Sequence, residues 1–173
     1  EMRDVETAQI GIQASLTGHL VLSTVHTNSA IAAITRLRDM GIESFLLASS
    51  LRTIISQRLV RRLCKKCKYE EVASSQAVNL FNLDPGTGIW NSKGCNECSN
   101  TGYQGRIAIA ECIQVDKKLK EMIHNRESEN VISEYVFKDN QSIDQASRDL
   151  LISGITSCDE LIRVGNLQED VGI

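Results

Sequence analysis

Four cysteines, arranged as two Cys-x-x-Cys pairs, constrain this chain more than any other feature. Cys64 and Cys67 form the first pair, and Cys95 and Cys98 form the second, with residues 68–94 between them. Two such pairs are typical of a structural Zn²⁺ site, in which four thiolates hold the ion. A pair of disulfides or free thiols are the alternatives. Zinc would explain how the segment between the pairs stays ordered, since it has little aliphatic patterning.

The overall composition is that of an ordinary soluble globular protein. Hydrophobic residues make up 42% and charged residues 24% of the 173 residues, and the net charge is −3, which gives no global indication of nucleic-acid binding. The sequence contains no apolar run near the roughly 20 residues of a membrane span, and no signal peptide is visible. Cysteine pairs without an export signal favour a reducing cytoplasm, in which thiolates bind metal.

Two remaining cysteines and the chain start add smaller expectations. Cys112 and Cys158 lie outside the paired motifs, and we expect them to pack as small hydrophobic side chains. The sequence begins at Glu1 without an initiator methionine, so we expect it to be a fragment of a longer protein.

The first forty residues predict a helix–strand–helix unit of an α/β domain. Apolar spacing indicates a helix over residues 6–16, and the aliphatic run 19–25 suits a strand buried on both faces. A serine then caps a helix over residues 29–40. Ligands bind beyond the carboxyl ends of strands in such domains, so His26 stands where chemistry is expected. The alternative is a structural histidine with satisfied hydrogen bonds.

The rest of the chain predicts short elements on either side of the cysteines. We expect a helix over residues 45–55, strands over 57–63 and 107–113, and three or four short helices after residue 116. Two capping-box patterns begin at Ser142 and Ser157. The final eight residues predict a frayed tail.

A basic run leads into the first cysteine pair. Between Arg52 and Lys68 there are seven basic residues and no acidic one, and zinc ribbons often bind nucleic acid. A zinc-ribbon nucleic-acid-binding module is therefore the alternative function. However, the run contains no aromatic residue, so it lacks a platform for base stacking. A solvated or subunit-facing strand is the better interpretation, and we expect no nucleic-acid partner.

Several stretches together resemble the ATPases of type II secretion and type IV pilus assembly. Residues 16–28 resemble the histidine box of that family, and residues 1–8 resemble the end of its Walker B region. Residues 57–61, the four cysteines, and residues 102–106 resemble the metal-binding insert of its secretion and pilus-extension branch. The resemblance extends over nearly the whole chain.

This resemblance implies an α/β fold made of three parts. Residues 1–63 would be the C-terminal part of a RecA-like P-loop ATPase core, and residues 64–106 would be a zinc-binding insert. Residues 107–173 would form a return strand and a small helical C-terminal subdomain. The implied protein is a homo-hexameric cytoplasmic ATPase that uses ATP and Mg²⁺ to power pseudopilus or pilus assembly. It would associate with the inner membrane through platform and assembly proteins.

The resemblance also implies roles for individual residues. Glu1 matches the Walker B glutamate that activates or orients water, although a carboxylate there also suits a solvated helix start. His26 matches the histidine near the γ-phosphate, His19 the first histidine of the box, and Arg106 a residue near the nucleotide. The four cysteines would hold structural zinc. The phosphate-binding pattern GxxxxGK(S/T) does not occur in the sequence, so we expect this chain alone not to hydrolyse ATP.

Overall fold

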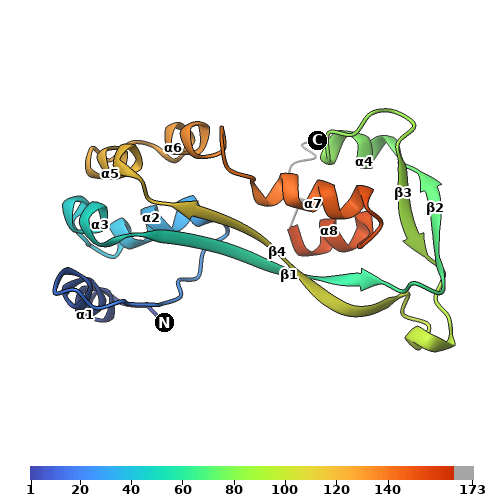
Figure 1. Cartoon of the computed structure of the whole chain (residues 1–173), viewed down its shortest axis with the longest axis horizontal. Coiled ribbons are helices and arrows are strands. Elements are labelled where there is room, and N and C mark those ends of the chain that lie inside the picture. The colour runs from blue at the N-terminus through green and yellow to red at the C-terminus, as the bar shows by residue number, and fades with distance from the viewer. Residues whose placement is uncertain (166–173) are drawn as a thin grey trace. The chain divides into compact units, whose positions relative to one another are not determined.

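The computed structural model describes residues 1–165, which form an α/β fold of two compact units (Figure 1). The first unit combines residues 1–56 with residues 111–141. The second combines residues 57–110 with the part of the chain from residue 142 onward. Each unit is therefore assembled from two stretches that lie far apart in the sequence.

Five helices make up the first unit, and two of them match the helices predicted from the sequence. Asp4 starts one by accepting the backbone N–H of Thr7, and Ser29 starts the next by accepting that of Ala32, as predicted. Side-chain acceptors of this kind satisfy N–H groups that a helix leaves open in its first turn. The helices are α1 (Val5–Leu16), α2 (Ala30–Asp39), α3 (Ser44–Ser50), α5 (Lys117–His124) and α6 (Glu129–Val136).

The core of the first unit is built from the apolar faces of these helices. Helix α3 packs against α1, α2 and α5, and α6 packs against α2 and α5 (Figure 1). Burial of aliphatic side chains supplies the main stabilisation here, roughly 25 cal/mol per Å² of apolar surface removed from water. The most deeply buried members include Ala8, Ile34, Leu47, Leu119, Ile123 and Ile132.

Residues 19–25 do not form the predicted buried strand, and that prediction was wrong. Leu20 and Leu22 are each 86% exposed. Val25 does pack against the core, and the Met2 N–H donates to the Thr24 carbonyl at 2.9 Å. A strand buried on both faces needs neighbouring strands on either side. Neither of the two sheets within residues 1–165 includes this stretch.

The strands form two separate pairs. Strand β1 (Thr53–Leu63) pairs with β4 (Tyr103–Gln114), and β2 (Lys68–Val72) pairs antiparallel with β3 (Gly88–Ser92). Strands β1 and β4 confirm the predicted strands and extend them. The predicted helix over 45–55 was too long, because the β-branched run that follows α3 already belongs to β1.

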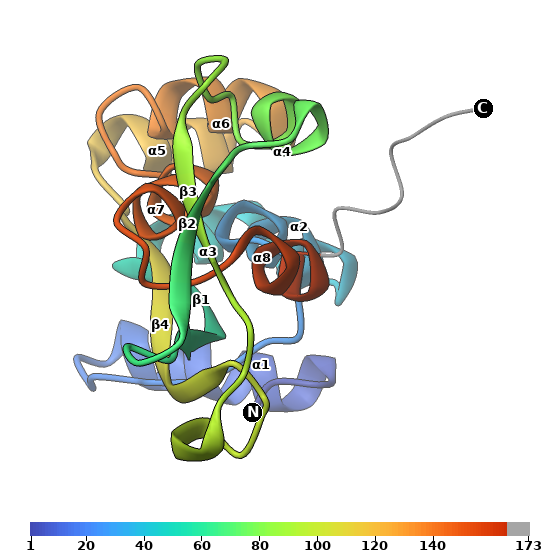
Figure 2. The ribbon, with the colours of Figure 1, turned by 90° about the vertical axis from the view of Figure 1, so that its right-hand side faces the viewer.

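The second unit contains structure that the sequence analysis missed. The segment between the cysteine pairs holds β2, the helix α4 (Ser75–Leu80) and β3. Helices α7 (Ile143–Ile152) and α8 (Cys158–Gly165) both pack against β3 (Figure 2). The apolar side chains of these helices and strands form a second hydrophobic core. The folding of the segment between the cysteine pairs therefore does not depend on a bound metal alone. The main members of this second core are Val60, Phe81, Leu83, Ile89, Ile109, Leu151 and Leu161.

The C-terminal helices follow the predicted count, with α5 to α8 after residue 116. The capping box at Ser142 is confirmed, since Ser142 and Gln145 exchange backbone-to-side-chain hydrogen bonds. At the second predicted box the Ser157 hydroxyl accepts the Glu160 N–H, but the Glu160 carboxylate is bound to two arginines instead. That box is therefore only half formed.

Cys158 packs half-buried against the second core, as predicted, whereas Cys112 is exposed and that prediction was wrong. Cys112 lies on the outward face of β4, between the buried side chains of Glu111 and Ile113. The predicted frayed tail lies outside the described residues. Across residues 1–165, none of the helices has the length and apolar character needed to span a membrane.

Candidate functional site

The four paired cysteines converge on one point in the second unit. Their Sγ atoms all lie within 4.8 Å of one another. The Sγ separations are 3.9 Å for Cys64 and Cys95, 3.9 Å for Cys67 and Cys98, and 3.7 Å for Cys95 and Cys98. In a disulfide the two sulfur atoms are about 2.05 Å apart. In a tetrahedral zinc site with Zn–S bonds of about 2.3 Å, the sulfur atoms are about 3.8 Å apart. The donor set and its spacing fit zinc.

Two turns and one glycine position the cysteines. The first pair lies in the turn between β1 and β2, and the second lies in a short 3-10 helix, Asn96–Cys98, before β4. The Cys64 N–H donates to the Gly102 carbonyl at 2.9 Å, and the Gly102 N–H donates to Cys98 Sγ at 3.3 Å. Gly102 has φ +80°, and a Cβ there would collide with the Ser92 side chain. Glycine at this position therefore lets the two turns approach each other.

The electrostatics of the cluster favour a bound cation. Burial raises the pKa of Cys98, but the backbone N–H groups of Cys95 and Gly102 outweigh it and lower that pKa to about 6. At Cys67, burial and hydrogen bonds with the neighbouring thiols raise the pKa to about 12. Without a cation, the cluster therefore favours a Cys98 thiolate beside a protonated Cys67. A divalent cation would stabilise four thiolates at once.

A buried glutamate, which the sequence analysis missed, lies close to this centre in the fold. The Glu160 side chain is 0% exposed and binds the Arg61 guanidinium at 2.7 and 2.9 Å and the Arg163 guanidinium at 2.7 and 2.8 Å. It also accepts the Arg61 backbone N–H at 2.9 Å. Burial alone would raise the pKa of Glu160, but these arginine hydrogen bonds lower it to about 2. Glu160 is therefore held as a carboxylate.

Arg61 extends this network to the strand that leaves the metal centre. Its guanidinium lies 4.0 Å from the centroid of the Tyr103 ring, and the Tyr103 hydroxyl is 2.6 Å from Ser157 Oγ. The Thr156 hydroxyl donates to the Arg61 carbonyl at 2.8 Å. Tyr103 directly follows Gly102, so the network joins β1, β4 and the start of α8 beside the cysteines.

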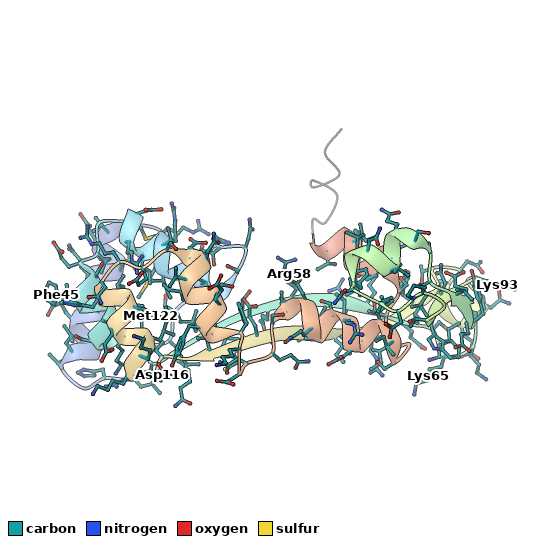
Figure 3. All side chains as sticks on the ribbon, turned by 90° about the horizontal axis from the view of Figure 1, so that it is seen from above. Phe45, Arg58, Lys65, Lys93, Asp116 and Met122 are labelled. Atoms are coloured by element: carbon teal, nitrogen blue, oxygen red, sulfur yellow. The ribbon has the colours of Figure 1, made fainter. Side chains whose placement is uncertain are left out.

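The basic run is partly used inside the second unit. Arg58 donates to the Val164 carbonyl at 3.3 Å, and Lys68 donates to the Gly154 carbonyl at 2.9 Å while lying over the Trp90 ring. Lys65, by contrast, projects into solvent (Figure 3). Because Arg58, Arg61 and Lys68 have internal partners, the run does not present a continuous basic stripe of the kind that binds phosphates.

In the first unit the structure brings Glu1 and His26 together. His26 Nε2 lies 2.6 Å from Glu1 Oε1, and Arg3 binds the same carboxylate at 2.6 and 2.8 Å. The Arg3 hydrogen bonds, followed by the His26 contact, lower the pKa of Glu1. The His26 side chain is 83% exposed. An ionised carboxylate and an accessible imidazole therefore lie side by side, although they are about 25 residues apart in the sequence. The hydrogen bond from the Met2 N–H to the Thr24 carbonyl brings the two stretches together just before His26.

The other two predicted nucleotide-site residues lie elsewhere. His19 Nδ1 is 3.1 Å from Thr17 Oγ1 and 3.2 Å from the Ala14 carbonyl, so its ring packs over the end of α1. Arg106 is exposed on β4 in the second unit. Of the four predicted residues, the structure thus joins two.

Comparison with known proteins places these features in a family. A family model for type II/IV secretion system proteins matches residues 1–163. The chain belongs to this family. The type II secretion system protein E of Klebsiella pneumoniae is 49% identical over 164 residues, covering 95% of this chain and 33% of that protein. The type II secretion system ATPase E of Vibrio cholerae is 46% identical over 166 residues, with the same coverage. This secretion system protein thus spans about a third of the length of those relatives.

Two solved structures share the fold of this chain. The pilus retraction motor PilT, determined with bound ADP, superimposes with a TM-score of 0.63 at 23% identity, over 94% of this chain and 37% of PilT. The Legionella pneumophila ATPase DotB superimposes with a TM-score of 0.60 at 19% identity, over 96% of this chain and 36% of DotB. At these identities the likeness concerns the fold of this secretion system protein.

Proposed function

We propose that this chain is the C-terminal part of a secretion ATPase that hydrolyses ATP to drive assembly of a pseudopilus or pilus. The observation that carries the proposal is the contact between Glu1 and His26 in a chain of the type II/IV secretion system family. A relative named as an ATPase and a solved pilus motor with bound ADP support it. Residues 1–63 would complete a RecA-like core together with the preceding part of the longer protein.

The two facing side chains have complementary roles in this proposal. ATP with Mg²⁺ supplies the phosphoryl group and the leaving group. Glu1, kept ionised by Arg3, accepts a hydrogen bond from the attacking water and orients it. His26 holds the carboxylate from the other side and faces the γ-phosphate. His19 supports the end of α1.

The cysteines have a structural role in the same proposal. Cys64, Cys67, Cys95 and Cys98 together hold one Zn²⁺, and all four ligand positions belong to the protein. A closed four-cysteine site is typical of structural zinc, because catalytic zinc keeps one position open for water or substrate. The ion would fasten the turn after β1 to the turn before β4.

The assembly proposal concerns the longer protein. We propose that six copies form a ring in the cytoplasm and that inner-membrane platform and assembly proteins recruit it. In this proposal ATP binds between neighbouring subunits of the ring, and the GxxxxGK(S/T) loop, which this chain does not contain, comes from another part of the longer protein. For the same reason we propose that the 173-residue chain alone does not hydrolyse ATP.

The test uses the longer protein with Glu1→Gln and His26→Ala. Each variant is expected to lower kcat by about 100-fold or more, because both groups act at the reacting phosphate. His124→Ala, an exposed histidine on α5, is the matched control and should leave kcat unchanged. Turnover that survives both substitutions would contradict the proposal. Turnover by the 173-residue chain that His26→Ala abolishes would contradict its inactivity.

The nucleic-acid alternative is tested in the same preparation. Because its basic run is partly paired internally, the chain is expected to show no salt-dependent binding to DNA or RNA at physiological ionic strength. Tight binding that weakens steeply with salt, and that Lys65→Ala with Lys66→Ala removes, would instead favour a zinc-ribbon module.

A further inference from the structure

A second buried glutamate lies in the first unit, near the C-terminal end of β4. Glu111 is 2% exposed, and its Oε1 accepts the backbone N–H of Ala30 at 2.8 Å. The two residues are 81 positions apart in the sequence. Ala30 is the first residue of α2, so the carboxylate of a return strand contacts the amino end of the helix that follows the histidine box.

The physical setting makes this contact strong. The first N–H groups of a helix have no partner inside the helix, and the helix dipole favours negative charge there. Ser29 already accepts the Ala32 N–H, so Glu111 satisfies a second open donor of the same turn. A buried carboxylate without hydrogen bonds is costly, so the chain gains by keeping the amino end of α2 against β4.

The held turn lies next to His26. Three residues connect His26 to Ala30, and within them the Thr27 hydroxyl donates to the Ser29 carbonyl at 3.0 Å. Residues 27–29 are therefore held by a hydrogen bond of their own, and Glu111 holds the Ala30 end of this segment. At the other end His26 meets Glu1. The imidazole itself is 83% exposed, so little packing around the ring would hold it in place.

We propose that Glu111 is a positioning residue for the histidine box. By anchoring the amino end of α2, it keeps the link to His26 in the conformation that places the imidazole beside Glu1. In this proposal Glu111 does not touch the reacting atoms, and its effect on His26 is transmitted through the Ala30 contact at the start of α2. This inference rests on the proposed ATPase function, because its consequence is measured in turnover.

The experiment compares three substitutions in the longer protein. Glu111→Met keeps the length of the side chain and removes its hydrogen-bond acceptors. Glu111→Gln keeps an acceptor oxygen and serves as the conservative rescue. Cys112→Ser, exposed at the next position of the same strand, is the matched control. Circular dichroism and melting temperature establish that each variant is folded, and ATP turnover is measured over a range of ATP concentrations.

Glu111→Met is expected to lower kcat by about tenfold or more with a change in KM for ATP below about threefold, because alignment fails while nucleotide binding persists. Glu111→Gln should retain at least about a third of the wild-type kcat, since its oxygen still accepts the Ala30 N–H. A folded Glu111→Met protein with wild-type kcat overturns the inference. So does an equal loss in kcat for Gln and Met, which would show that charge and not anchoring matters.

A second variant decides the outcome if Glu111→Met does not fold. Ala30→Pro removes the donor instead of the acceptor, and proline is well tolerated at the first helical position. Ser29 already has the extended backbone that a following proline requires. Loss of kcat in this variant supports the inference, and wild-type kcat overturns it. Absence of turnover in the wild-type protein would instead refute the proposed function itself.

Discussion

The four-cysteine centre and the proposed histidine box, residues 16–28, differ in how their geometry is held. At the centre, Cys64 is 0% and Cys98 is 6% exposed, and the backbone N–H groups of Cys95 and Gly102 both donate to Cys98 Sγ. At the box, the His26 side chain is 83% exposed and its identified partner, Glu1, lies near the surface too. Two of the four cysteines are thus buried within the second unit and two are partly buried, whereas His26 is held mainly through the residues on either side of it.

The two regions are therefore expected to contribute differently: the cysteine cluster stabilises the fold, and the exposed Glu1–His26 pair is available for chemistry. A closed cluster has no position free for a reactant, so it can only hold the fold together. Groups that act on a bound molecule must remain accessible, and they therefore contribute little burial energy. Substitutions in the second unit should change stability, and substitutions in the histidine box should change turnover.

Cys98→Ser should have the largest effect. Structural zinc contributes about 10–16 kcal/mol in small zinc domains, and loss of one thiolate ligand removes much of that. We expect loss of bound zinc and a melting temperature lowered by more than about 10 °C, measured by metal analysis and by thermal unfolding. Cys112→Ser, which alters an exposed thiol outside the cluster, should leave both unchanged. Normal zinc content in Cys98→Ser would contradict the assigned ligand.

Glu160→Gln should be next in size. Replacing the buried carboxylate by an amide weakens its charge-assisted hydrogen bonds to Arg61 and Arg163, and because both arginines are partly exposed the cost is about 1.5–3 kcal/mol. Urea denaturation measures the loss, and Asp159→Asn, an exposed neighbour on the same helix, is the control, with an expected change below about 1 kcal/mol. Equal stabilities of the two variants would show that the Arg61–Glu160–Arg163 network is dispensable.

The same carboxylate predicts a pH dependence. Its folded pKa of about 2 lies below the ordinary value of 4.5, so the folded state binds a proton less readily than the unfolded chain. The contribution to stability is complete above about pH 5 and is lost as the pH falls toward 2, amounting to about 3 kcal/mol at most. Urea denaturation across this range should show a slope in wild type that is reduced in Glu160→Gln.

Gly154→Ala should have an intermediate effect in the second unit. Gly154 has φ +65°, and an added Cβ would lie 2.6 Å from Trp90 Cγ. Gly86→Ala is the matched control, because Gly86 has φ +89° with nothing within 4 Å of the added atom. Both carry a left-handed backbone cost of about 1–2 kcal/mol. The free energy of unfolding should fall by about 1–3 kcal/mol more in Gly154→Ala than in Gly86→Ala. This difference measures the contact with the tryptophan ring.

His26→Ala should have the smallest effect on stability. The side chain is largely exposed and its ion pair with Glu1 lies at the surface, where such pairs contribute at most about 1 kcal/mol. The free energy of unfolding of the 173-residue chain should therefore change by less than about 1 kcal/mol in urea. A loss as large as that of Glu160→Gln would remove the distinction between the two regions.

The sequence predicted features whose signals are local. The spacing of Cys64, Cys67, Cys95 and Cys98 was enough to predict their convergence, and a serine before an apolar stripe was enough to locate α2. The serine lies at the first turn of the helix that it starts, and each cysteine pair is itself a local motif, so the metal chemistry shared by the two pairs predicted a contact across 31 residues.

Features that depend on distant partners were not predicted. Glu160 and Arg61 are 99 residues apart, and nothing near Glu160 marks it as buried. The aliphatic run 19–25 reads as a strand, but pairing needs neighbouring strands, and its leucines remain exposed. The segment between the cysteines contains β2, α4 and β3, whose core residues Phe81, Leu83 and Ile89 are spaced too irregularly to reveal a period.

The most direct test of the account is X-ray absorption spectroscopy of the zinc edge on the purified 173-residue chain, combined with metal analysis. The account predicts one zinc per chain, surrounded by four sulfur atoms at about 2.3 Å. A metal-free chain that melts at the same temperature with and without chelator would contradict it. So would a zinc shell containing nitrogen or oxygen in place of one of the four sulfurs.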